Sequence, residues 1–173
     1  MTAITAVVQF LVALAFVTIP MVRSRYGAQA QAAAEAELTR QGVRTTVLAD
    51  NGIRFDAGGH ETIAPVTLAL MAAVPACLTL TGGDLGETLS WYLMPLVLLA
   101  DVGILYSQLT AEKSVTAAFA KKGDPELTRI DVRSLLDTAE RAFPSWVFPH
   151  LQNARHGVVM GGAVLTLVLL ALN

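Results

Sequence analysis

The chain has 173 residues, of which 54% are apolar and only 15% are charged, and its formal net charge is −2. Soluble domains average about 25% charged residues, so this composition excludes an ordinary soluble protein and indicates a membrane protein. The twelve basic residues are offset by fourteen acidic ones and form no basic cluster, which excludes nucleic acid as a partner.

Long apolar stretches divide the sequence at about 2–22, 63–81, 89–109 and 157–172. Each approaches the roughly 20 residues that a helix needs to cross a hydrocarbon core of about 30 Å. The sequence therefore predicts an all-α integral membrane protein with four transmembrane helices. Residues 1–173 form a single membrane domain, and the lipid bilayer is its first expected partner.

Every Lys and Arg lies in one of two loops, 23–62 and 110–156. Basic residues near the ends of spans are retained in the cytoplasm, so both loops are predicted to be cytoplasmic and both termini to lie on the other side. Nine Arg to three Lys, with a surplus of Ala, is typical of a high-GC bacterium. The predicted location is therefore the bacterial cytoplasmic (inner) membrane.

The first loop is predicted to contain a helical extension and a small β-hairpin. Residues 29–40 are rich in Ala, Glu and Gln, which favour continuation of the first helix. The dipeptide Asn51-Gly52 separates two β-prone runs, 43–49 and 53–57, and such a dipeptide is a strong hairpin signal. A lone hairpin is marginal in water, so we expect this one to pack on a helix, the lipid headgroups or a partner chain.

The second loop is predicted to continue the third helix as far as residue 122 and then to form an amphipathic helix. Asp124-Pro125-Glu126 is a strong helix start. Apolar residues then recur at helical spacing: Leu127, Ile130, Leu135, Ala139 and Phe143. Two placements are open, on the membrane surface or against the helical extension of the first span.

Aromatic residues are expected to anchor the spans at both surfaces. Trp91 and Tyr92 lie at the non-cytoplasmic end of the third span, and Trp146 and Phe148 lie in the stretch that precedes the fourth. Amphipathic rings prefer this depth.

Asp101 lies almost midway along the third span and is the first candidate for function. A carboxylate at that depth must face the bundle interior, take a partner or stay protonated. Gln108 lies on the same helical face, two turns further along. The two residues either line a proton or cation path or form a strut between helices.

Small residues are expected to let helices approach closely. Gly157 and Gly161 are four residues apart in the fourth span, and Ala69 and Ala73 have the same spacing in the second. Such faces pack against another helix of the same chain or of a partner.

Three histidines, His60, His150 and His156, lie at the cytoplasmic ends of spans and are weak candidates for a metal site. Their spacing matches no established ligand pattern, and no phosphate-binding Gly loop or hydrolase motif is present. No cofactor is expected.

These patterns favour a non-enzymatic accessory or scaffolding subunit that associates with other membrane subunits or with itself. The first alternative is a small proton- or cation-coupled transporter or channel that uses Asp101. The second is a membrane enzyme with a site near His60, Glu61, His150 and His156.

Overall fold

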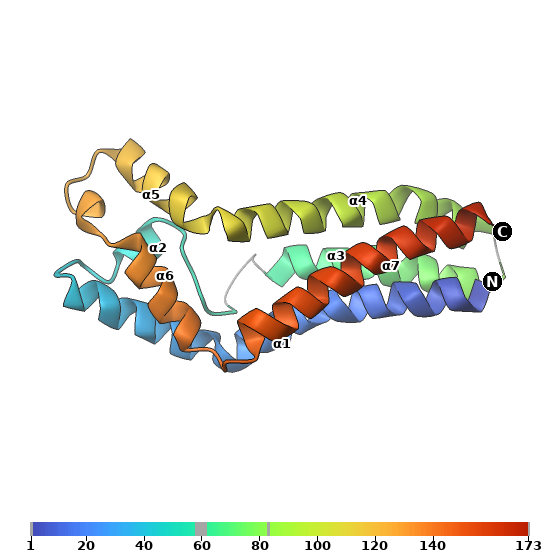
Figure 1. The fold of residues 1–173 in the computed structure, drawn as a ribbon, viewed down its shortest axis with the longest axis horizontal. Coiled ribbons are helices and arrows are strands. Elements are labelled where there is room, and N and C mark those ends of the chain that lie inside the picture. The colour runs from blue at the N-terminus through green and yellow to red at the C-terminus, as the bar shows by residue number, and fades with distance from the viewer. Residues whose placement is uncertain (1, 58–61, 83, 173) are drawn as a thin grey trace.

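The computed structural model describes residues 2–57, 62–82 and 84–172. This part of the chain is helical and contains no strand (Figure 1). Four of its helices are long and apolar enough to cross a membrane by length and composition. They are α1 (Thr2–Arg40), α3 (Ile63–Leu80), α4 (Asp84–Leu109) and the segment Val147–Ala171, whose main part is α7 (Asn153–Ala171).

These helices form a four-helix bundle in which α1 and α4 each contact both α3 and α7. Both termini lie at one end of the bundle (Figure 1), called here the terminal end. The opposite end, from which the two long loops leave, is called the loop end. Fully buried apolar side chains fill the middle of the bundle: Val12, Phe16, Met94, Val97 and Val159.

The outward faces of the bundle carry large apolar side chains. Leu99 is 67% exposed and Tyr92 is 69% exposed, both on α4. Contiguous apolar surface of this extent is rare on a soluble monomer and suits contact with lipid.

The loops form a second group of helices beyond the loop end (Figure 1), which we call the distal cluster. It consists of residues 30–40 of α1 together with α2 (Val47–Asp50), α5 (Ala111–Lys122), the 3₁₀ helix η2 (Leu127–Arg129) and α6 (Val132–Arg141). The cluster has a core of its own, separate from that of the bundle, in which Leu38, Leu48 and Leu135 are at most 1% exposed.

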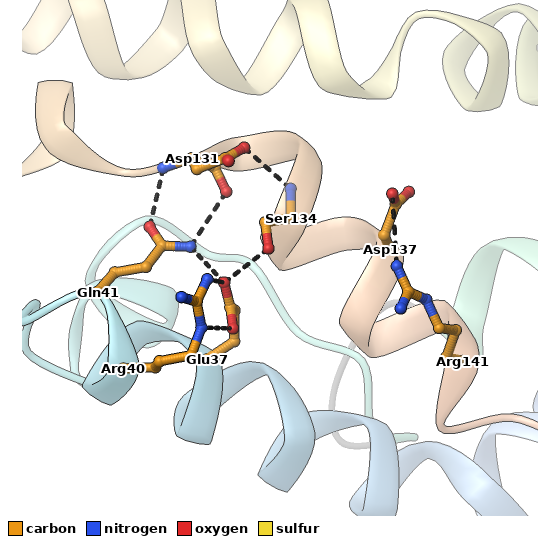
Figure 2. Close-up of polar contacts among 7 residues, drawn as sticks. All are labelled: Glu37, Arg40, Gln41, Asp131, Ser134, Asp137 and Arg141. Carbon is orange, nitrogen blue, oxygen red and sulfur yellow. Dashed lines mark hydrogen bonds and ion pairs between the residues drawn. The ribbon is translucent and has the colours of Figure 1, made fainter.

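A network of hydrogen bonds joins α6 to the end of α1 (Figure 2). Glu37 is 6% exposed, and its carboxylate accepts hydrogen bonds from Arg40 at 2.6 and 2.7 Å, from Gln41 at 2.7 Å and from the Ser134 hydroxyl at 2.7 Å. These donors, with Arg40 the largest contributor, lower the pKa of Glu37 from its ordinary 4.5 to about 2. Gln41 also bonds the backbone of Asp131, whose side chain caps the first turn of α6.

The predicted β-hairpin is wrong. Residues 47–50 form α2, a single helical turn, and Asn51-Gly52 ends that turn rather than joining two strands. The Asn51 side chain donates to the Val47 carbonyl at 2.8 Å, and Gly52 takes the positive φ of +67°. The helical turn prevails because it buries Val47 and Leu48 together in the distal core, whereas alternation along a strand would point them to opposite faces.

The amphipathic segment packs against the extension of α1, which is the second of the two placements that the sequence left open. It is two helices rather than one. Ile130 has extended backbone between η2 and α6, and Asp131 rather than Asp124 provides the N-cap of α6 by accepting from the Ser134 amide at 3.0 Å.

Two glycines let helices of the bundle come close together. A Cβ on Gly86 of α4 would collide with the backbone of Thr79 on α3. A Cβ on Gly162 of α7 would lie 2.6 Å from Cγ2 of Val12 on α1. Close packing at these two points fixes α4 and α7 in the bundle.

Candidate functional site

Asp101 lies on the inner face of α4 and is fully buried. That face also carries Val97 and Met94, one and two helical turns towards the terminal end, and both are fully buried. Helical spacing thus turns the carboxylate away from the apolar exterior and into the bundle.

The partner of Asp101 is His156, in the first turn of α7. Nδ1 of His156 lies 2.9 Å from Oδ2 and 3.0 Å from Oδ1 of Asp101. The His156 side chain is only 7% exposed. The pair therefore links α4 to α7 from a position screened from bulk water.

Polar side chains continue from the pair towards the loop end. Nε2 of His156 lies 3.0 Å from Oε1 of Gln108, and the Gln152 amide donates to the same oxygen at 2.6 Å. Nε2 also lies 3.3 Å from a terminal guanidinium nitrogen of Arg155.

The two neighbours of Nε2 require opposite protonation states. Gln108 Oε1 is an acceptor, so it needs a proton on Nε2, whereas Arg155 is a donor and needs a lone pair there. When the Asp101–His156 pair holds an extra proton, Nε2 donates to Gln108. When that proton leaves, Nδ1 donates to the Asp101 carboxylate and Nε2 accepts from Arg155. The site therefore offers a hydrogen-bond partner for each state.

A pocket of about 260 Å³ adjoins this network at the loop end, between α1, α6, η3 (Val147–Gln152) and α7. Gln108, Gln152 and Arg155 belong to both the network and the pocket wall. The remaining wall is largely apolar and includes Ile19, Val22, Phe55, Phe143, Phe148 and Leu151.

Charged groups of both signs line the pocket. Nε of Arg155 is buried and has no hydrogen-bond partner within the described residues. Glu140 of α6 faces the pocket, where burial, aided by the nearby charge of Asp137, raises the pKa of its carboxyl. A terminal nitrogen of Arg23 donates to the Arg54 carbonyl at 2.5 Å at another part of the wall.

A second buried polar layer lies nearer the terminal end. The Gln9 amide donates to the Ser90 hydroxyl at 2.6 Å, and both side chains are fully buried. Ser90 precedes Asp101 by eleven residues, about 16 Å along the helix. The fully buried apolar side chains of the bundle core lie between the two polar layers.

The residues expected to pack helices together lie in different surroundings. Ala69 is buried inside the bundle and Ala73 is partly buried against its core. Gly157 and Gly161 instead lie on the outer face of α7, with open space where a Cβ would stand.

The expected anchor residues are distributed over both ends. Trp91 and Tyr92 are exposed near the start of α4. Trp146 makes an edge contact with Tyr26 at a centroid distance of 6.4 Å. Phe148 makes one with Phe143 at 5.3 Å, within the pocket wall.

The histidines do not share one environment. His156 is buried against Asp101, His150 is exposed, and His60 lies outside the described residues, as does Glu61. Where the structure is described, no group of three or more His, Cys, Asp and Glu side chains is arranged to hold a metal ion.

Sequence reasoning missed His156 as the partner of Asp101, and Arg155 and Gln152 beside it. The apolar run begins at residue 157, which placed His156 at the membrane surface. The continuous helical segment begins earlier, at Val147, and carries His156 into the bundle. The polar residues Gln152, Arg155 and His156 directly ahead of an apolar run are the signal that could have indicated an inward-facing polar group.

No protein-family profile, curated protein or solved structure matches this chain. Function is therefore inferred from the site alone.

Proposed function

We propose that this protein is a small bacterial inner-membrane transporter that couples proton binding at the Asp101–His156 pair to the movement of a solute. The observation that carries the proposal is the burial of this pair between two apolar helices, joined through Gln108 to a pocket at the loop end.

A buried ionisable pair inside an apolar bundle supports a role in proton transfer. Charged groups at membrane depth are costly, and where they occur they commonly mark proton relays or substrate paths. Histidine is the side chain that changes charge near physiological pH. Two separate partners for Nε2 allow His156 to change protonation state without losing its hydrogen bond.

The side from which the proton arrives follows from the basic loops. If these loops are cytoplasmic, the pocket is reached from the cytoplasm, and the apolar layer that contains Val97 and Phe16 separates the pair from the opposite side. The bundle has a pocket at its loop end and a closely packed apolar core across its middle. This arrangement suits a carrier in an inward-facing state better than an open channel.

Proton flux in proteoliposomes tests the proposal. Vesicles containing a trapped pH indicator are presented in turn with Na⁺, K⁺, an organic cation, an amino acid and an organic sulfonate. At least one class should change the internal pH of wild-type vesicles, and Asp101→Asn and His156→Gln should abolish the change. Asp84→Asn, which alters an exposed carboxylate on the same helix, is the matched control. Flux absent for every class, or equal in wild type and Asp101→Asn, contradicts proton coupling.

The accessory or scaffolding subunit remains a second candidate, and one observation favours it. Gly157 and Gly161 form a strip without side chains on the outside of α7, and no described residue packs against it. A neighbouring helix packed there would make close contact. Under this function Gly161→Leu lowers the mass of the natively extracted assembly, whereas Gly103→Leu, an equally open position on α4, leaves it unchanged. Equal masses count against the scaffold.

A further inference from the structure

The side chain of Arg155 contacts both the Asp101–His156 pair and the pocket. Its terminal nitrogen lies 3.3 Å from His156, while its Nε is buried without a hydrogen-bond partner among the described side chains and its side chain lines the pocket. A buried N–H donor without an acceptor, such as this Nε, is costly to maintain unless a ligand or water accepts from it.

The charge of Arg155 is balanced differently in the two proton states. Without the extra proton, the Asp101–His156 pair carries one negative charge, which Arg155 compensates through Nε2. With the proton bound, the pair is neutral overall and Nε2 turns to Gln108. Arg155 is then left with an uncompensated positive charge facing the pocket.

The rest of the pocket suits an anion with an apolar body. Phe55, Phe143 and Phe148 supply aromatic surface, and the Gln152 amide lies near Arg155. The carboxylate in the wall, Glu140, lies on an exposed residue of α6, where partial burial and the charge of Asp137 raise the pKa of its carboxyl. The volume of about 260 Å³ is just below the roughly 300 Å³ at which ordinary small-molecule pockets begin, so the ligand is small.

We propose that this pocket binds a small organic anion through Arg155, and that binding is coupled to uptake of one proton by the Asp101–His156 pair. The inference rests on the proposed function and names its substrate class.

The coupling is balanced in charge. One proton from solvent adds at Nε2 of His156, and the Nε2–Arg155 hydrogen bond is replaced by an Nε2–Gln108 bond. One anion then takes the place of Nε2 as acceptor for Arg155. The site gains one positive and one negative charge, so its net charge is unchanged. By linkage, the anion binds more tightly as the pH falls, and the proton binds more tightly when the anion is present.

Four groups face this exchange from the surrounding helices. Asp101 on α4 and Arg155 on α7 contact His156 directly. Glu140 on α6 and Arg23 on α1 lie across the pocket. Substitutions at these residues can therefore remove proton uptake and anion binding separately.

Isothermal titration of the full-length protein in lipid nanodiscs tests the proposal, with 4-phenylbutyrate as probe and the uncharged 4-phenylbutanamide as control. The acid is fully ionised at neutral pH, so any proton taken up goes to the protein. Titration in two buffers of different ionisation enthalpy then measures that uptake. The acid should bind at least about ten-fold more tightly than the amide, since a charge-assisted hydrogen bond is lost in the amide. Binding should be accompanied by net proton uptake.

Three variants and one control variant show which residues are responsible for anion binding and for proton uptake. Arg155→Lys should weaken binding of the acid about ten-fold and keep some preference for it. His156→Gln should bind the acid without proton uptake. Leu151→Trp should fill the pocket and abolish binding of both compounds, while Arg133→Gln, which removes an exposed guanidinium on α6, should change nothing.

Equal affinity for acid and amide, no binding of either, or binding without proton uptake in the wild type overturns the inference. If another solute class moves protons in vesicles while the acid fails to bind, proton coupling stands and the anion site fails. If the acid binds as described but no class moves protons, the anion site stands and transport fails.

Discussion

The imidazole of His156 lies 2.9 Å from the carboxylate of Asp101, although the two residues are 55 positions apart. The contact joins α4 to the first turn of α7, the two bundle helices that the second long loop connects. Its energy depends on both partners, because either charge alone is poorly solvated there.

The first prediction concerns this mutual dependence. His156→Ala leaves the Asp101 carboxyl buried without its partner and should lower the free energy of unfolding by about 3–5 kcal/mol. Adding Asp101→Ala should recover part of that loss, because the unpaired group is removed. Denaturant unfolding of both single variants and the double variant in detergent micelles gives the coupling energy. Additive losses would show that the two residues do not interact.

The second prediction concerns pH and the distal cluster. The pKa of Glu37 is about 2 in the folded protein against an ordinary 4.5, so its contribution to stability is complete above pH 4.5 and is lost as the pH falls towards 2. At neutral pH Glu37→Gln should lower the free energy of unfolding by about 1–2 kcal/mol, a value reduced because Arg40 is largely exposed.

Thermal unfolding followed by circular dichroism checks this contribution. The difference between wild type and Glu37→Gln should shrink as the pH falls below 4.5. Asp137→Asn is the control, because the Asp137–Arg141 pair is 3.8 Å apart and largely exposed, and it should change stability little. A Glu37→Gln difference that is constant across this range would contradict the lowered pKa.

The third prediction compares neighbouring glycines. Gly162→Val places a branched side chain against Val12 and should lower the free energy of unfolding by about 1–3 kcal/mol. Gly161→Val meets open space and should leave the monomer unaffected. Unfolding in detergent that keeps the protein monomeric makes the comparison. Equal losses at both positions would mean that α7 is rotated from the orientation described.

The fourth prediction concerns the apolar layer between the two polar layers. Val97→Asn introduces a polar amide between Ser90 and Asp101, one turn from Asp101, and should admit water to the apolar layer. Vesicles with this variant should lose an imposed pH gradient faster than wild type when no solute is added. Met94→Leu, which keeps the layer apolar, should hold the gradient as well as wild type. An unchanged gradient in Val97→Asn would show that the layer is not the barrier.

Hydropathy predicted the long apolar helices well. A chain that crosses lipid must make all its backbone hydrogen bonds within a helix, and that helix needs an apolar run of about 20 residues, which is easy to recognise in a sequence. The start of the fourth helical segment was less predictable. Pro149 and the polar residues up to Arg155 obscure the helical start at Val147, so the sequence placed His156 at the beginning of the span rather than inside the helical segment.

Asp101 was recognisable from its depth alone, but its partner was not. Helical spacing fixes which residues share a face within one helix, and it gives no information on which face of another helix lies opposite. The hairpin failed for a related reason. Asn51-Gly52 is compatible with several types of turn. The burial of Val47 and Leu48 against the distant helix α6 favours the helical turn over the hairpin.

The protonation of His156 Nε2 tests the central claim most directly. Nitrogen-15 NMR of protein labelled at histidine, in lipid, reads out the proton on each ring nitrogen, and the exposed His150 provides an internal reference. At alkaline pH Nδ1 should carry the proton and Nε2 should accept from Arg155. Once the pair takes up its extra proton, Nε2 should be protonated and bonded to Gln108. An Nε2 that keeps its proton at every pH, or an unchanged spectrum in Asp101→Asn, would contradict a proton-binding pair.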